Sequence, residues 1–140
     1  MRIRMTKKTL VFSTLFALHA LVQSPAYAAK KTIENCEKIK DDTIEYSQCL
    51  DVVKEAIDRE LQTWVNNQVF TLEELALKTG RKSALAMFKR SQKNFITFRE
   101  NNCRWQYLAI SPSIQAAPAY KKCYIQLSQT RIKELDQLGK

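Results

Sequence analysis

Residues 91–103 read SQKNFITFRENNC, and the spacing in this stretch decides how the chain folds. Side chains recur in it at intervals of four, three and four residues, and these are Gln92, Ile96, Arg99 and Cys103. That spacing places them along one face of an α-helix. If Cys103 is bridged to another helix, Arg99 lies one turn before the bridge and therefore at a helix interface.

A polar face of this kind is either a functional site or a set of polar contacts that hold helices together. We favour a structural clamp formed by Gln92, Arg99 and Arg131, with a functional site built from the same residues as the alternative. A guanidinium at a helix interface has five N–H donors and needs carboxylate or carbonyl partners. For Arg99 the candidate acceptors are Asp58, Glu60 or exposed carbonyls near residue 112.

The longest apolar stripe predicts a helix that begins after Asp42. Its members recur at three and four residues and are Tyr46, Cys49, Leu50, Val53, Ile57, Leu61, Trp64 and Val65. Asp42 and Glu45 form a capping box at its start, which separates it from a short helix around residues 33–39. Thr71 and Glu74 form a second capping box, which predicts a separate short helix ending near Gly80.

Two more helices are expected in the second half of the chain. The first runs from Ser83 to about Leu108, and Pro112 and Pro118 then bracket a loop over residues 111–117. Pro118 suits the first turn of a last helix, which continues to Leu138. No long stretch shows the alternation of apolar and polar residues that is typical of a β-strand. The predicted fold is therefore all-α: a small disulfide-stapled bundle of three main helices plus short helical turns.

The cysteines predict two disulfides. There are four, Cys36, Cys49, Cys103 and Cys123, and they include no close pair of the kind that binds zinc, so no metal is expected. We favour neighbour pairing, because the capping box lets the first two approach and the proline-bracketed loop folds the last two helices back as a hairpin. Each bridge is expected to stabilise the fold by about 3 kcal/mol.

The N-terminus has the order of a secretory signal peptide. Basic residues precede an apolar run from Leu10 to Val22, and small residues lead up to Ala28. We expect residues 1–28 to be a cleaved signal peptide and residues 29–140 a single domain. Since the expected new N-terminus has no cysteine, the protein is predicted to be periplasmic or secreted rather than a lipoprotein.

The sequence offers little catalytic equipment. His19 is the only histidine and is removed with the signal peptide, which excludes Ser-His, Cys-His and His-metal chemistry in the mature chain. The two glycines, Gly80 and Gly139, form no phosphate-binding loop. We predict a protein that is not an enzyme and needs no cofactor.

Charge is divided unevenly along the mature chain. Residues 29–77 hold six basic and eleven acidic residues, and residues 78–140 hold thirteen basic and three acidic ones. The densest basic run contains Lys78, Arg81, Lys82, Lys89, Arg90 and Lys93, with no acid between them. The run is either a solvated or internally paired face, or a surface for an anionic partner. Nucleic acid is an unlikely partner, because the aromatic residues fall mainly on apolar stripes.

These motifs together resemble a known family, the small secreted LprI-like proteins, named after a lysozyme inhibitor. Gln92, Phe95, Phe98, Arg99 and Cys103 resemble its Gln-x-x-Trp-x-x-aromatic-Arg-x-x-x-Cys signature, with phenylalanine in place of tryptophan. Further similar positions are Cys49, Ala56, Asp58, Leu61, Cys123, Arg131 and Leu135. The resemblance implies an exported, α-helical, disulfide-bonded domain, and it suggests a lysozyme or another envelope protein as partner.

Two functions follow as hypotheses. The first is a protein-binding module of the bacterial envelope that inhibits a lysozyme; many lysozymes are cationic, so an acidic loop or the acidic first helix would make the contact. The alternative is a structural or adaptor domain that binds anionic glycan or lipid headgroups through a basic helix face. The candidate contact residues are Lys89, Arg90, Lys93 and Trp105, with Trp105 expected to be exposed beside Arg104 and Tyr107.

Overall fold

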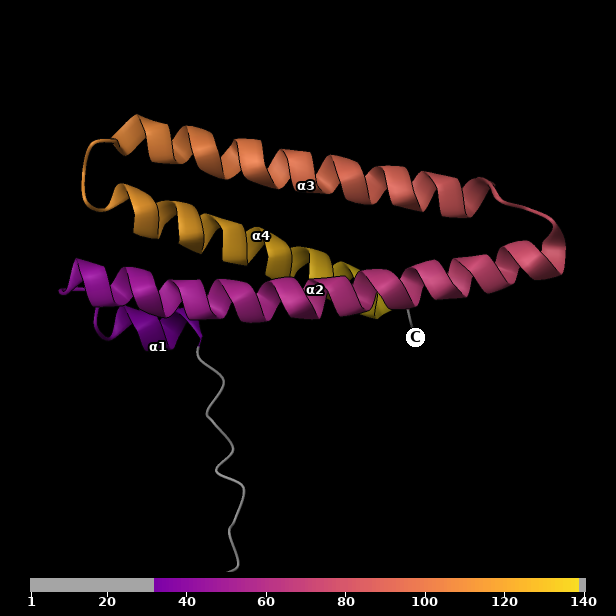
Figure 1. Ribbon diagram of the computed structural model, residues 1–140, viewed down its shortest axis with the longest axis horizontal. Helices are drawn as coiled ribbons and strands as arrows, with labels where there is room; N and C mark the ends of the chain where they lie inside the picture. Colours follow the sequence, from indigo (N-terminus) through magenta and orange to yellow (C-terminus); the bar gives the residue numbers. More distant parts are fainter. Residues whose placement is uncertain (1–31, 139–140) are drawn as a thin grey trace, which may run out of the picture.

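The computed structural model describes residues 32–138, which form four helices and no β-strand. The helices are α1 (Ile33–Glu37), α2 (Thr43–Thr79), α3 (Ser83–Ile110) and α4 (Ala116–Leu138). Figure 1 shows α2 and α3 running antiparallel as the long edges of the molecule, with α4 between them and α1 against the start of α2. The predicted all-α bundle of three main helices is confirmed. The expected signal peptide, residues 1–28, lies outside the described residues.

Local sequence signals set both ends of α2. The carboxylate of Asp42 accepts hydrogen bonds from the backbone N–H groups of Ile44 and Glu45, at 3.0 and 2.9 Å, and so caps the first turn. At the other end Gly80 has a φ of 72°, a left-handed conformation that glycine adopts without steric cost, and its N–H donates to the Ala76 carbonyl. The helix is therefore stopped by a single glycine.

The prediction of a separate short helix after Thr71 is wrong, because α2 continues through this position without a break. Thr71 Oγ1 donates to the carbonyl of Asn67 at 3.1 Å, one turn earlier, rather than capping a new helix. No glycine or proline lies between Asp42 and Gly80. With nothing to break the ladder of backbone hydrogen bonds, adding a residue to an existing helix is easier than starting a new one.

Both disulfides pair neighbouring cysteines, as the sequence predicts. Cys36 and Cys49 join α1 to α2, and Cys103 and Cys123 join α3 to α4; each pair of Cα atoms lies 5.6 Å apart. Pro118 occupies the third position of α4, where its missing N–H removes no helical hydrogen bond. Pro118 therefore fits the start of α4, and the Cys103–Cys123 disulfide holds α3 and α4 together as a hairpin.

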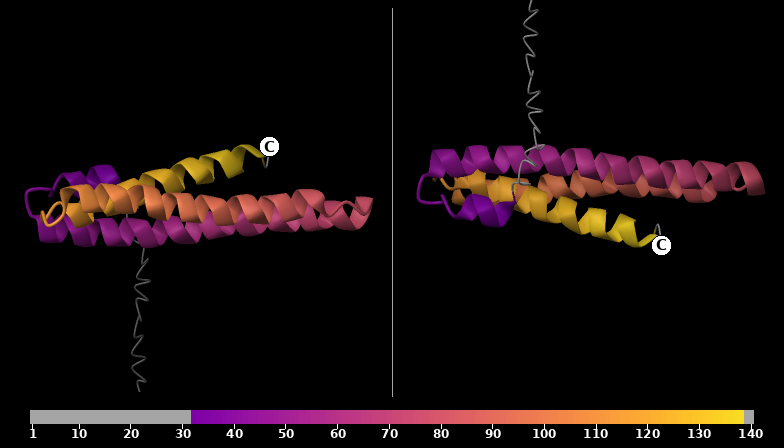
Figure 2. Two further views of the ribbon diagram at one scale, coloured as in Figure 1. Left: turned by 90° about the horizontal axis from the view of Figure 1, so that it is seen from above. Right: turned by 90° about the horizontal axis from the view of Figure 1, so that it is seen from below.

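Helix α4 completes the core. Ile125 and Leu135 of α4 are fully buried in one apolar cluster with Leu50 of α2, and burying a side chain of this size contributes about 1.5–3 kcal/mol. Figure 2 shows that α4 diverges from the other two helices and ends before they do. The turn between α2 and α3 is left as a two-helix hairpin without α4. In the described part of the chain, no helix has the length and apolar character needed to cross a membrane.

Candidate contact surface

Arg99 joins three helices. It projects from α3, is buried, and its Nη1 donates to Ser128 Oγ of α4 at 2.8 Å and to Asp58 Oδ1 of α2 at 3.4 Å. The guanidinium carbon also lies 3.7 Å from the centre of the Tyr124 ring, a distance suited to a cation–π contact. Asp58, one of the partners expected from the sequence, is the carboxylate that it contacts.

Tyr124 and Asp58 extend this network. The Tyr124 hydroxyl donates to Asp58 Oδ1 at 2.9 Å. Burial of the ring, together with this hydrogen bond to the carboxylate, raises the pKa of Tyr124 to about 12. The phenol is therefore a neutral hydrogen-bond donor at physiological pH and supplies no nucleophile.

The other two residues of the expected clamp meet each other. Arg131 of α4 donates from Nε to Gln92 Oε1 of α3 at 3.2 Å and from Nη1 to Glu134 at 2.8 Å. The structure thus divides the polar face into an Arg99 network and a separate Arg131–Gln92 contact. Both arginines are buried; Arg99 Nη1 and Arg131 Nε donate to neighbouring helices, Arg131 Nη1 donates to Glu134 of its own helix, and Arg99 Nε has no partner among the described residues. The structural role of the three residues stays a proposal, which the stability test below addresses.

The loops at one end of the bundle lie side by side. Figures 1 and 2 place the turn between α1 and α2 next to the loop between α3 and α4. Gln115 Nε2 donates to Thr43 Oγ1 at 3.0 Å across this junction. Lys121 Nζ donates to Ser47 Oγ and to Asp51, both at 2.7 Å, and so connects α4 to α2. Polar contacts from distant parts of the sequence therefore fix this end.

Two isoleucine side chains at this end are exposed to solvent. Ile44 of α2 is 72% exposed and Ile114 of the α3–α4 loop is 75% exposed. Both line a surface hollow of about 430 Å³ together with Thr43, Ser47 and Gln48. Exposed apolar side chains that gather in one place, unlike those scattered singly, commonly mark an interaction site.

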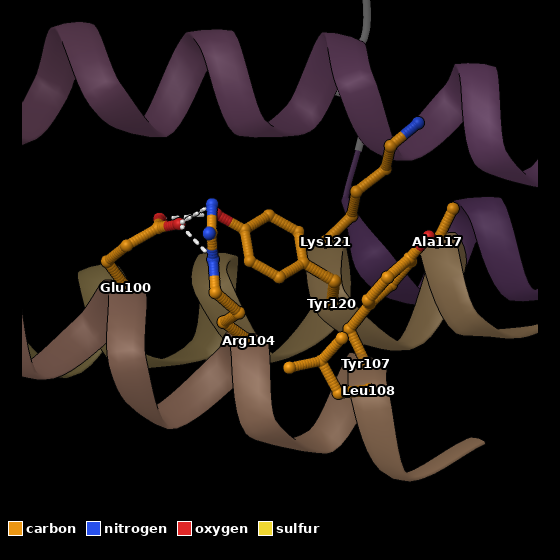
Figure 3. Close-up of a pocket in the computed structure, with 7 residues that line it drawn as sticks. All are labelled: Glu100, Arg104, Tyr107, Leu108, Ala117, Tyr120 and Lys121. Atoms are coloured by element: carbon orange, nitrogen blue, oxygen red, sulfur yellow. Dashed lines mark hydrogen bonds and ion pairs between the residues drawn. The ribbon is translucent and has the colours of Figure 1, made fainter. Parts of the chain in front are cut away.

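A second hollow of about 520 Å³ lies between α3 and α4, and Figure 3 shows its lining. The Tyr120 hydroxyl donates to Glu100 Oε2 at 2.6 Å, and Arg104 forms an ion pair with the same carboxylate at 3.1 Å. Burial, aided by the hydrogen bond to Glu100, raises the pKa of Tyr120 to about 12. Tyr107 and Leu108 form the apolar wall, and Lys121 extends toward α2.

A hydrogen bond connects the linings of the two hollows, since Lys121 of the second donates to Ser47 of the first, and we treat both hollows as one candidate surface. We call it the loop-end surface, defined by Ile44, Arg104, Tyr107, Leu108 and Ile114. Aromatic residues, arginine and aliphatic side chains are what the centres of protein interfaces contain. Both disulfides lie in the helices that carry this surface, so a partner would meet a pre-organised structure.

The contact residues expected from the sequence lie elsewhere on α3. Trp105 is 59% exposed, but it lines a separate, shallower hollow with Asn94, Thr97, Phe98, Asn101 and Asn102, whereas Arg104 and Tyr107 line the loop-end surface. Neighbouring helical residues point about 100° apart, so adjacency in sequence is not adjacency on a surface. Lys89 forms an ion pair with Glu73 at 3.3 Å, while Arg90 and Lys93 are exposed.

Sequence reasoning missed Ile44 and Ile114. The available signal was that Ile44 follows the two aspartates of the α2 cap and falls outside the apolar stripe, and that Ile114 is an aliphatic residue inside a proline-bracketed loop. Neither signal says that the two meet. As for metals, residues 32–138 contain no group of three or more side chains placed to ligate one ion.

The fold is a small helical bundle pinned by two disulfides, of the kind found outside the cytoplasm. A family model described as lysozyme inhibitor LprI matches residues 34–135. The chain belongs to the LprI family. No curated protein and no solved structure matches it.

Proposed function

We propose that the protein is an exported, non-enzymatic inhibitor of a lysozyme, and that the loop-end surface makes the contact. The family match supports the inhibitor class. The observation that supports this surface is that two exposed isoleucines, 70 residues apart in sequence, lie together at the end of the bundle pinned by both disulfides. Exposed apolar side chains that lie together in one hollow are a common feature of interaction sites.

Charge around this surface suits a cationic partner. Asp41, Asp42 and Glu45 are exposed beside Ile44, while the basic run of residues 78–93 lies at the other end of α2. Complementary charge near an apolar contact accelerates association and fixes its orientation. A chain with a net positive charge can therefore still approach a cationic lysozyme with its acidic end first.

The test is a lysis assay with the oxidised protein and two double variants of it. Ile44→Ser with Ile114→Ser removes the exposed apolar contact without adding charge. Ile96→Ser with Leu138→Ser removes two other exposed aliphatic side chains away from the loop end and is the control. We expect the concentration for half-inhibition to rise at least about tenfold in the first variant and to stay unchanged in the second.

Two outcomes count against the proposal in different ways. Undiminished lysis at a large molar excess of the unaltered protein removes lysozyme inhibition. Equal inhibition by both double variants keeps the activity but moves it from the loop-end surface. Export is tested separately by mass spectrometry of the intact protein. A mass that corresponds to a chain starting at Ala29, with no lipid attached, supports signal-peptide cleavage and argues against a lipoprotein.

A further inference from the structure

The turn between α2 and α3 forms an uncovered tip at the end opposite the loops. Helix α2 ends at Thr79 and α3 begins at Ser83, so a very short link joins two long helices. Figures 1 and 2 show this hairpin projecting past the C-terminal end of α4. We call residues 75–87 the hairpin tip. No helix of the described bundle packs over it from the α4 side.

The hairpin tip and the helix that follows are strongly basic. Residues 75–93 contain six cationic side chains and no acid, and the six are Lys78, Arg81, Lys82, Lys89, Arg90 and Lys93. Lys89 is partly neutralised by Glu73 across the hairpin. Within residues 32–138 the other five form no ion pair, so their charge is available to an anionic partner. The cations available to a partner therefore include those next to the turn, Lys78, Arg81 and Lys82, rather than Lys89.

An aliphatic side chain stands among these charges. Leu77 is 86% exposed, the largest exposed fraction of any large apolar residue in the described chain, and it immediately precedes Lys78. Leu75 and Met87 are also exposed in the same tip. A cationic surface alone would suit any polyanion, including a glycan. Cations around a protruding leucine suit an interface in which anionic headgroups overlie an apolar layer.

We propose that the hairpin tip docks on an anionic phospholipid surface, with Lys78, Arg81 and Lys82 among the headgroup phosphates and Leu77 inserted between them. This inference is independent of lysozyme inhibition, since it uses the opposite end of α2. Each cation near an anionic bilayer contributes about a fivefold gain in partitioning, so removing three should lower it on the order of 100-fold.

Sedimentation with vesicles tests the proposal. The oxidised protein is mixed with phosphatidylcholine vesicles that either contain or lack phosphatidylglycerol, and the bound fraction is measured. Lys78→Ala with Arg81→Ala and Lys82→Ala is compared with Lys38→Ala, Lys40→Ala and Lys133→Ala, which removes the same charge from exposed sites outside the tip. All variants keep the same N-terminus, and circular dichroism confirms that each is helical.

Substitutions of Leu77 distinguish a lipid partner from other polyanions. Leu77→Ser should lower partitioning several-fold, and a tryptophan placed by Leu77→Trp should shift its emission to the blue on binding. Equal binding to vesicles with and without phosphatidylglycerol would overturn the proposal, as would equal losses in the two triple variants. Retention on an acidic glycan that ignores Leu77→Ser, without binding to vesicles, would assign the tip to a glycan instead.

Discussion

Arg99 of α3 contacts side chains of both other long helices, Asp58 of α2 and Ser128 of α4. Its replacement by alanine removes the donor to Ser128 and leaves Lys54 as the remaining cation in contact with Asp58 and with the Tyr124 ring. We expect Arg99→Ala to lower the free energy of unfolding by about 2 kcal/mol, measured by urea denaturation. Arg99→Lys should recover only part of this, because an ammonium lacks the planar fork of the guanidinium.

The matched control is Arg90→Ala, which removes an exposed arginine from the same helix and should change the stability by no more than about 0.5 kcal/mol. Equal effects of the two substitutions would contradict the clamp. A lysozyme assay on Arg99→Lys adds a second readout: if the residue is only structural, the inhibition of the folded variant matches that of the unaltered protein.

The two tyrosines that donate to carboxylates predict instability at alkaline pH. The pKa values of Tyr120 and Tyr124 are about 12 in the fold, against an ordinary value of 10.0. Since the native state keeps its phenolic protons where the unfolded chain has lost them, the stability that they provide is complete below pH 10 and falls as the pH rises toward 12.

This loss should appear as a decreasing unfolding midpoint in urea between pH 10 and 12, with tyrosinate absorbance rising as the protein unfolds. Tyr120→Phe with Tyr124→Phe should flatten the dependence, because no phenol then remains to ionise at these positions. A midpoint in the double variant that falls as steeply as in the unaltered protein would show that other groups control the alkaline limit.

At the scale of elements, local signals predicted most of the architecture. The cap at Asp42, the stop at Gly80 and the place of Pro118 in the first turn of α4 are each set by neighbours in sequence, and the structure contains all three. Thr71 misled because a capping-box pattern also fits inside a continuous helix. The loop-end surface could not be predicted, since Ile44 and Ile114 meet only after α4 has folded back and brought the two loops together.

Each disulfide closes a short loop and should stabilise the fold to a similar degree. The separations of 13 and 20 residues correspond to about 3 kcal/mol each in the loop-entropy account. Cys36→Ser with Cys49→Ser, and Cys103→Ser with Cys123→Ser, are compared by urea denaturation. Removing the second pair should also weaken lysozyme inhibition, because Cys103–Cys123 joins α3, which carries Tyr107 and Leu108, to α4 across the same hollow. A stability change below about 1 kcal/mol for either pair would contradict this account.

At the scale of the whole molecule, the exposed acidic residues Asp41, Asp42 and Glu45 lie at the start of α2, and the densest basic run lies at its end. This helix has 37 residues and therefore spans about 55 Å, with the acidic loop end at its start and the hairpin tip at its finish. The sequence showed that the two halves differ in charge, and the straight course of α2 places the acidic residues 41–45 and the basic run of residues 78–93 at opposite ends of this helix. Because exposed charges are screened over about 8 Å at physiological salt, the two ends act independently.

Independence of the two ends is itself testable with the variants already described. Lys78→Ala with Arg81→Ala and Lys82→Ala should leave lysozyme inhibition within about twofold of the unaltered protein, since distant sites contribute additively. Ile44→Ser with Ile114→Ser should likewise leave vesicle partitioning unchanged. A variant with all five substitutions should lose inhibition and vesicle partitioning to the same extent as the two separate variants, and no further. Loss of inhibition in the basic triple variant would instead extend the lysozyme contact to the hairpin tip, and would mean that one partner spans the whole length of α2.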